Sequence, residues 1–265
     1  MASGMFRLEV PGKRPHAMND TIQVFPTADA LAHGAAEKIV SVMGSALLES
    51  GPASFVFSGG NTPQSVYELL ASDRYAKRVD WSRVHFFWGD ERCVPPTHPD
   101  SNYHMVQQAF LRHLPIAPQH VHRIRGEVHP ADAAGIYETE LCSALGTARP
   151  AVPRLTMVLL GLGIDGHTAS LFPGTPVLHE KDRLIAELFV ERMGAWRITM
   201  TYPLLNNART VLFLVSGQNK AAILNTVHTD PGAQLPACRI APHSGELLWY
   251  ADRDAASHLS TTELP

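Results

Sequence analysis

The sequence predicts an α/β protein in which helices cover both faces of a mostly parallel sheet, so that the fold has three layers. Segments with apolar residues at helical spacing alternate along the chain with short, strongly apolar runs. Strands separated by helices form parallel βαβ units, and the helices cover the faces of such a sheet. The chain has 265 residues, of which 45% are hydrophobic, and can therefore bury a large core in one domain.

The elements follow in order along the chain. A helix is expected over 28–49, and the helix from Pro63 to Ser72 has proline in its first turn, where a missing N–H is tolerated. Further helices are expected over 102–113, 131–145 and 220–227. Strands are expected over 54–57, 84–88, 155–160, 196–201, 210–215 and 246–250. Because the chain shows no repeat or low-complexity linker, we expect a single domain over 20–256, between a flexible leader (1–19) and a loose tail (257–265).

The composition argues against several classes of partner. The net charge is −3, so nothing points to nucleic acid or an anionic membrane, and an anionic ligand must be held by a local basic cluster. We expect neither a membrane-spanning segment nor a secretory signal, because no apolar span reaches 18 residues and the N-terminus lacks the h-region of a signal peptide. Cys93, Cys142 and Cys238 are widely spaced, which fits reduced thiols. We therefore expect a cytoplasmic protein that is a monomer or a small homo-oligomer.

The segment after the strand at 155–160 is the most informative part of the chain. The apolar run ends in Gly161, Gly163 and Gly166, and Asp165 and His167 stand among these glycines. Ligands of open α/β sheets bind at the carboxyl ends of the strands. A carboxylate and a titratable base at such a strand end predict proton-transfer chemistry.

The same segment also matches GxGxxG, the pattern with which dinucleotide-binding proteins hold a pyrophosphate. That pattern functions only when a long helix follows at once and points its positive N-terminus at the phosphates. Pro173, Gly174 and Pro176 limit any helix after Gly166 to about two turns. Dinucleotide binding is therefore the weaker alternative.

Two other strand ends carry groups suited to an anion. The segment SGGNTP (58–63) precedes a predicted helix, whose exposed N–H groups favour a phosphate, although a plain glycine-rich turn is the alternative. It lacks the GK[ST] element of a Walker A loop. After the strand at 84–88, Arg92 can hold a phosphate or carboxylate and Asp90 can accept sugar hydroxyls, unless they form a surface ion pair.

Two further cations add to this pattern. Arg197 and Lys220 are each compatible with a solvated side chain, but we expect both at strand ends of the same sheet. Other chemistries find little support, because HExxH and GxSxG are lacking. Ser170 is a possible nucleophile by its spacing from His167 alone. The histidines at 120, 122 and 129 lack a supporting carboxylate or cysteine, which favours a solvated loop over a metal site.

Five segments together resemble the 6-phosphogluconolactonase family, whose relatives include glucosamine-6-phosphate deaminase and the ribose-5-phosphate-isomerase-like folds. They are SGGNTP (58–63), WGDER (88–92), GLGIDGHTASLFP (161–173), RITMT (197–201) and SGQNKA (216–221). The third is specific, and the ordered set is very specific. The deaminase shares the Gly-x-Gly-x-Asp-Gly-His core, but the continuation TASLFP and the segment WGDER are lactonase-like.

The resemblance implies a Rossmann-like αβα fold of the ribose-5-phosphate-isomerase/deaminase type. It also implies hydrolysis of a phosphosugar lactone, 6-phospho-D-glucono-1,5-lactone, to 6-phospho-D-gluconate in the oxidative pentose phosphate pathway, without metal or cofactor. His167 is the expected general base for the attacking water, and Asp165 is expected to orient it or contact the sugar. The expected substrate-binding residues are Ser58, Gly59, Gly60, Thr62, Asp90, Arg92, Arg197 and Lys220.

Two alternatives stay open. An amino-sugar phosphate deaminase or an aldose–ketose isomerase on the same scaffold also needs a carboxylate and a histidine near a phosphate clamp. A non-catalytic sugar-phosphate sensor would bind without turnover. Such regulators usually carry an effector module, and the sequence has no basic helix–turn–helix segment.

Overall fold

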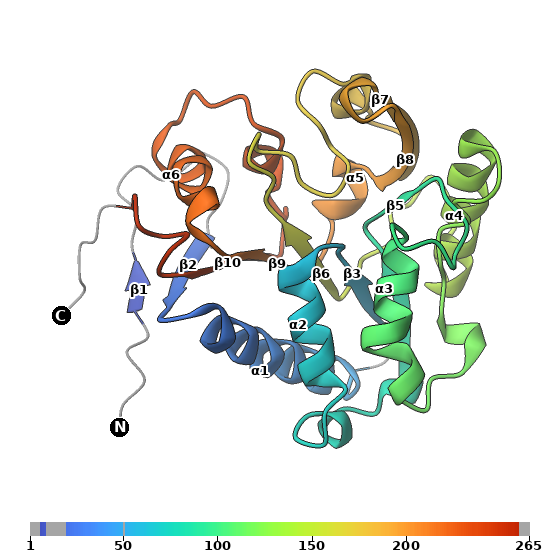
Figure 1. The fold of residues 1–265 in the computed structure, drawn as a ribbon. Coiled ribbons are helices and arrows are strands. Elements are labelled where there is room, and N and C mark those ends of the chain that lie inside the picture. The colour runs from blue at the N-terminus through green and yellow to red at the C-terminus, as the bar shows by residue number, and fades with distance from the viewer. Residues whose placement is uncertain (1–5, 9–19, 50, 260–265) are drawn as a thin grey trace.

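The structure is a computed structural model that describes residues 6–8, 20–49 and 51–259. A seven-stranded sheet lies at its centre, in the order β1-β2-β10-β9-β6-β3-β4 (Figure 1). Its strands are β1 (Phe6–Leu8), β2 (Asp20–Phe25), β3 (Ala53–Phe57), β4 (Val84–Trp88), β6 (Met157–Gly161), β9 (Thr210–Val215) and β10 (Glu246–Asp252). All neighbouring strands are parallel except β1 and β2. The mostly parallel α/β sheet predicted from the sequence is therefore confirmed.

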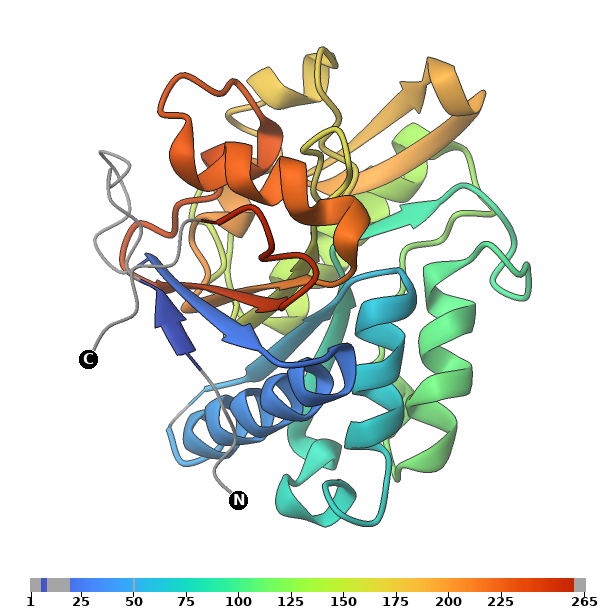
Figure 2. The same cartoon turned by 60° about the vertical axis from the view of Figure 1, so that its left-hand side comes forward.

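Helices lie on both faces of this sheet. They are α1 (Ala28–Ala46), α2 (Asn61–Leu70), α3 (Asn102–Ala109), α4 (Pro130–Ala144), α5 (Tyr202–Leu205) and α6 (Ala221–Thr229). α1 and α2 cover one face and α6 the other, which gives the three predicted layers (Figures 1 and 2). Short 3₁₀ turns connect the elements: η1 (Ala76–Arg78), η2 (Trp81–Arg83), η3 (Leu111–His113), η4 (Pro118–His120), η5 (Pro176–His179), η6 (Glu191–Met193), η7 (Gln218–Lys220) and η8 (Pro236–Arg239).

The core lies between the central sheet and these helices. β3 and β9 are buried along their whole length, as strands covered on both faces must be. Aromatic rings fill much of the space, and Phe213 of β9 stacks on Trp249 of β10 with ring centroids 3.7 Å apart. Thr27 caps α1 by accepting the N–H of Ala30, so that this helix starts where its apolar face meets the sheet.

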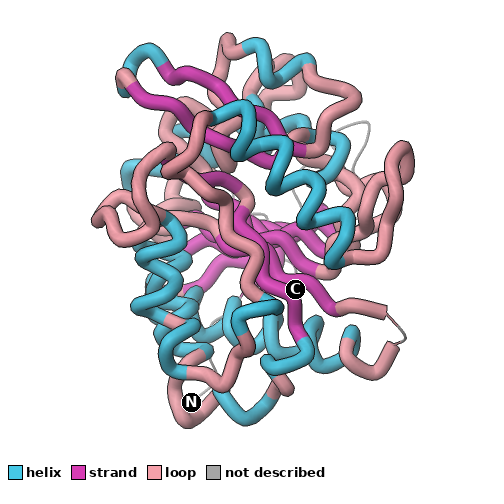
Figure 3. Tube along the Cα trace, turned by 90° about the vertical axis from the view of Figure 1, so that its right-hand side faces the viewer, coloured by secondary structure: helices cyan, strands magenta, loops and turns pink. Residues whose placement is uncertain are grey.

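A second, antiparallel sheet stands beside the first. It has the order β5-β8-β7 and consists of β5 (Asp90–Arg92), β7 (Ile185–Val190) and β8 (Ala195–Met200). β7 and β8 form a hairpin that projects above the central sheet (Figure 3). No strand was expected at β2, β5 or β7. The strand expected at 196–201 was expected in the same sheet as Lys220, which is wrong, because β8 pairs with β5 and β7.

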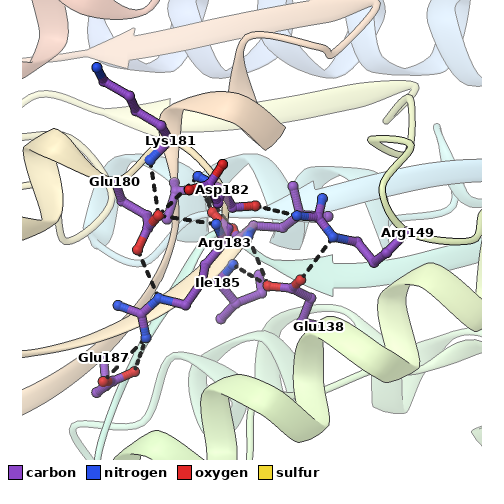
Figure 4. Close-up of polar contacts among 10 residues, drawn as sticks. Glu138, Arg149, Glu180, Lys181, Asp182, Arg183, Ile185 and Glu187 are labelled. Carbon is purple, nitrogen blue, oxygen red and sulfur yellow. Dashed lines mark hydrogen bonds and ion pairs between the residues drawn. The ribbon is translucent and has the colours of Figure 1, made fainter.

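Polar contacts anchor the start of this hairpin to α4 (Figure 4). The carboxylate of Glu138 accepts the N–H groups of Leu184 at 2.8 Å and Ile185 at 3.1 Å. Arg149, which follows α4, lies 3.4 Å from the same carboxylate. The ion pairs of Arg183 with Glu180 and Glu187 stay within the hairpin segment and do not reach α4. The hairpin therefore leaves the body of the protein in a fixed direction.

The remaining expectations concern the ends of the chain and the membrane. Residues 1–5, 9–19 and 260–265 lie outside the described residues, so the leader and tail stay predictions there. β1 lies within the expected leader and pairs with β2. None of the described helices combines the length and the hydropathy that crossing a bilayer requires.

Candidate active site

The carboxyl ends of β3, β6 and β9 border a cleft of about 390 Å³. These three strands are neighbours in the sheet, so the loops that follow them meet at one edge. The cleft is lined by segments 58–63, 161–163 and 214–216 together with Asp90, Arg92, Asn102, His167, Ala169 and Lys220. Of the predicted site residues, Asp165 and Arg197 are not among those that line it.

The turn from β3 into α2 is held so that its backbone faces the cleft. The buried hydroxyl of Tyr67 accepts the N–H of Ser58 and donates to its carbonyl, both at 2.9 Å. A Cβ on Gly59 would lie 2.1 Å from Oδ1 of Asn102, and Gly60 has a φ of 106°, so both positions require glycine. No side chain caps α2, which leaves the N–H groups of its first turn for a ligand.

Asp90 belongs to β5 of the small sheet and contacts the loop that follows β6 of the central sheet. Its carboxylate accepts the hydroxyl of Ser170 at 2.6 Å and the amide of Asn102 at 3.4 Å. The backbone N–H of Ser170 in turn donates to Thr199 of β8 at 3.2 Å. Ser170 is 1% exposed, so its hydroxyl is committed to Asp90 inside the protein. These bonds join the loop after β6 to both β5 and β8.

The two residues after Asp90 have different surroundings. Glu91 is buried and accepts the N–H groups of Asn102 at 2.7 Å and Tyr103 at 2.8 Å, so its charge stands at the positive end of α3. Burial raises the pKa of the Glu91 carboxyl, and these bonds offset only part of that effect. Arg92 lines the cleft, and its guanidinium donates to the carbonyl of Asp100.

The loop after β6 bends back on itself to present His167. The N–H of Gly163 donates to the carbonyl of His167 at 2.8 Å, and Gly166 has a φ of 79°. A Cβ on Gly163 would lie 2.0 Å from Nδ1 of His167, so only glycine leaves room for the imidazole. No α-helix follows Gly166 before η5, within a fully described stretch of chain. The GxGxxG match therefore lacks the helix that a dinucleotide site needs.

Asp165 contacts both the imidazole of His167 and the guanidinium of Arg192. Its Oδ1 lies 2.5 Å from Nδ1 of His167, and its Oδ2 lies 2.5 Å from Nη2 of Arg192. Burial alone would raise the pKa of the Asp165 carboxyl, but the bond and charge of His167 and then the charge of Arg192 outweigh it and lower that pKa. A carboxylate at Nδ1 favours the tautomer that carries its proton on Nδ1, in which Nε2 is the acceptor nitrogen.

The two remaining cations lie in different sheets. Lys220 follows β9 and lines the cleft, and burial lowers the pKa of its ammonium group although Asp165 opposes this effect. Arg197 lies within β8, directly opposite Arg92 of β5. Burial, and then the charge of Arg92, lower the pKa of the Arg197 guanidinium. The expectation that Arg197 and Lys220 end strands of one sheet is therefore wrong, because β8 pairs with β5 and β7 instead.

The expectation of a solvated loop at the histidine-rich segment holds for the exposed His129 and is wrong for His122. His122 is 7% exposed, lies 2.9 Å from His85 through Nε2, and lies 2.9 Å from Glu140 through Nδ1. His85 stacks on both His120 and His122. The described part of the chain holds no group of three or more His, Cys, Asp or Glu side chains arranged for a metal ion.

Two residues of the site were missed in the sequence. Asn102 was assigned only to the start of a helix, yet it lines the cleft and contacts Asp90. Its one signal is a polar side chain in a first helical turn close to a strand end. Arg192 belongs to no motif, and its role depends on the hairpin that brings it to Asp165.

Comparisons with known proteins agree with this geometry. A family model described as "Glucosamine-6-phosphate isomerases/6-phosphogluconolactonase" matches residues 26–249. The chain is 39% identical over 246 residues to a 6-phosphogluconolactonase of Nostoc sp., covering 92% of this chain and 100% of that protein. It is 37% identical over 206 residues to a 6-phosphogluconolactonase of Haemophilus influenzae, covering 77% and 86%.

Solved structures show the same likeness. The 6-phosphogluconolactonase from Trypanosoma cruzi has a TM-score of 0.82 at 30% identity, covering 93% of this chain and 100% of that chain. A monomeric glucosamine-6-phosphate deaminase has a TM-score of 0.73 at 20% identity, covering 91% and 100%, and at that identity the likeness concerns the fold alone. The chain therefore belongs to the family of glucosamine-6-phosphate isomerases and 6-phosphogluconolactonases.

Proposed function

We propose that the chain hydrolyses 6-phospho-D-glucono-1,5-lactone to 6-phospho-D-gluconate. The observation that carries this proposal is the shared cleft, in which His167 stands with Lys220 and the uncapped N-terminus of α2. A base and an anion site in one cleft suit a substrate with an ester carbonyl at one end and a phosphate at the other. The named relatives from Nostoc and Haemophilus support the choice of substrate.

At the carbonyl end, His167 acts as general base. Its Nε2 takes a proton from a water while the water oxygen bonds to C1, and the carbonyl oxygen becomes an oxyanion. When the tetrahedral intermediate collapses, the bond from C1 to the ring oxygen breaks, and Nε2 returns the proton to that oxygen. Asp165 holds the imidazole in the required tautomer through Nδ1.

At the phosphate end, the first turn of α2 and the cation of Lys220 hold the substrate. We assign Ser58, Gly59, Gly60 and Thr62 to this part of the cleft. Binding energy from the remote phosphate places C1 beside His167. Asp90 and Arg92 stand at the sugar hydroxyls, and Arg197 acts at longer range from the strand opposite Arg92.

A water, rather than Ser170, supplies the attacking oxygen in this proposal. The Ser170 hydroxyl is buried and donates to Asp90. It would have to break that bond and leave the interior to reach a substrate. His167, in contrast, stands at the surface of the cleft with its side chain 26% exposed.

The test is an assay with freshly generated lactone and a control without enzyme, because the lactone also hydrolyses spontaneously. We expect hydrolysis well above the control and no ammonia from glucosamine 6-phosphate. Ammonia release with slow lactone hydrolysis would favour the deaminase alternative. Binding of 6-phosphogluconate without turnover of either compound would favour the sensor.

The cellular context is part of the proposal. Cys93, Cys142 and Cys238 are free thiols, which supports a reducing compartment, and we propose the cytoplasm. We propose a monomer or small homo-oligomer that needs no metal or organic cofactor, since His167 and Asp165 supply the proton transfer. Light scattering of the purified protein measures the oligomeric state.

A further inference from the structure

The tip of the β7–β8 hairpin reaches Asp165, the partner of the proposed general base, through one side chain. η6 forms this tip, and Gly194 closes it in the left-handed conformation with a φ of 57° and its N–H donated to Glu191 at 3.0 Å. From the tip, Arg192 places Nη2 2.5 Å from Oδ2 of Asp165. The pairing of β8 with β5 and the contacts of Glu138 with the start of β7 fix the position of the tip.

Arg192 and His167 also share a neighbour. The guanidinium carbon of Arg192 lies 4.8 Å from the centroid of the Phe172 ring, and the imidazole centroid of His167 lies 4.3 Å from it. Asp165 has one oxygen on each partner, Oδ1 on His167 and Oδ2 on Arg192. A carboxylate held at both oxygens keeps its plane, and Oδ1 therefore points at Nδ1 in one direction.

We propose that Arg192 is a positioning residue for the lactonase reaction and acts through Asp165. It fixes the carboxylate and balances its charge, so that the imidazole of His167 stays in the orientation in which Nε2 takes the proton of the attacking water. Without Arg192, the negative charge of Asp165 beside the imidazole would be left unbalanced, which would favour the protonated imidazole. The role of Arg192 in catalysis rests on the proposed function, whereas its effect on the imidazole can be measured without turnover.

The test compares Arg192→Gln with Arg183→Gln. Arg183 is a matched control, because both side chains are 51% exposed and ion-paired, but Arg183 pairs with Glu180 and Glu187 (Figure 4). Arg192→Gln should lower kcat by about 10- to 100-fold, as loss of an outer partner of a reactive group typically does, with KM little changed. The pH below which kcat declines should be higher in Arg192→Gln than in the unaltered protein. Arg192→Lys should restore most of kcat and most of its pH dependence. Arg183→Gln should change neither kcat nor its pH dependence.

A double substitution separates action through Asp165 from direct contact with the substrate. In the Asp165→Asn background, Arg192→Gln should have almost no further effect on kcat. Independent, multiplicative effects, or a raised KM with normal kcat, would overturn the proposal by placing Arg192 on the substrate. The same holds if Arg192→Gln has the activity and pH profile of the unaltered protein.

The titration of His167 can be measured in a protein that turns over no substrate. It therefore tests the role of Arg192 separately from the proposed lactonase reaction. The titration of the His167 imidazole, followed by NMR, should move to higher pH in Arg192→Gln and stay unchanged in Arg183→Gln. An unchanged titration in both variants overturns the positioning role, even if the protein proves inactive on the lactone. A shifted titration in an inactive protein supports the role of Arg192 while rejecting the proposed reaction.

Discussion

Nδ1 of His167 lies 2.5 Å from Oδ1 of Asp165, a residue only two positions earlier in the chain. The same carboxylate oxygen lies 3.2 Å from the backbone N–H of His167, so one oxygen orients both the ring and the peptide unit that bears it. Such a short loop can present an imidazole in one orientation because few backbone dihedrals separate the two groups.

Replacement of His167 by Gln should abolish most of the catalysis. We expect kcat to fall by about 10²- to 10⁴-fold with KM nearly unchanged, because the general base acts in the transition state and not in binding. Steady-state kinetics on fresh lactone measure both constants. His113→Gln is the control, since His113 is exposed in η3 and does not line the cleft. Near-normal turnover of His167→Gln would contradict the base assignment.

Gly163 should be irreplaceable for steric reasons alone. In Gly163→Ala the Cβ would lie 2.0 Å from Nδ1 of His167 and 2.7 Å from Oδ1 of Asp165. The imidazole must move, so kcat should fall sharply, and overpacking should lower the free energy of unfolding by about 1–3 kcal/mol. Gly135→Ala in α4 is the control, because nothing lies within 4 Å of its added Cβ. An active, fully stable Gly163→Ala would show that the loop relaxes freely.

Lys220→Met should weaken the binding of the phosphate. Loss of a charged hydrogen bond costs about 1.5–3 kcal/mol, which corresponds to a rise of about 10- to 150-fold in the Kd of 6-phosphogluconate. Calorimetry with the product avoids the spontaneous loss of the lactone. Lys181→Met serves as the control, because Lys181 is exposed and outside the cleft. Equal Kd values for both variants would remove Lys220 from the phosphate site.

The same lysine predicts a pH dependence of binding. Burial lowers the pKa of Lys220, so its positive charge is lost at a lower pH than that of an ordinary lysine. The Kd of 6-phosphogluconate should therefore begin to rise on the alkaline side before exposed lysines titrate. In Lys220→Met this alkaline rise should be absent. A rise of the same size in the variant would assign it to another group.

His85 should contribute to acid sensitivity of the fold. Burial, and then the charges of His122 and His120, lower the pKa of His85 to about 4, whereas histidine in an unfolded chain has a pKa of about 6.5. As pH falls, the unfolded chain takes up the proton first, so the contribution to stability is complete above pH 6.5 and is lost toward pH 4. Urea midpoints of His85→Gln should therefore decline less over this range than those of the unaltered protein. Parallel declines would contradict this role.

Much of the site could be predicted because it follows from parallel strands. β3, β6 and β9 are mostly apolar and end in glycine-containing turns, so the loops bearing Ser58, His167 and Lys220 were expected at one edge. Adjacent strands bring such loops together whatever the length of the intervening helices. The cleft that these loops line agrees with that expectation.

The small sheet could not be predicted in the same way. β5 consists of Asp90, Glu91 and Arg92 alone, and three charged residues carry no apolar period from which to infer a strand. β7 follows a charged stretch and exposes Phe189 while burying smaller side chains, so its two faces are mixed. Arg192 and Asp165 lie far apart in the chain and meet only through this sheet. A contact of this kind depends on tertiary structure and leaves no local signal.

Successive residues of the strand β5 point to opposite faces, so its three charged residues serve two roles. Asp90 and Arg92 line the cleft, whereas Glu91 between them secures the first turn of α3. Substitution of Arg92 should thus give folded protein with impaired activity, whereas substitution of Glu91, or of Asp90 with its buried bond to Ser170, should also lower expression. A screen that scores activity alone would rank all three residues together and conceal the difference.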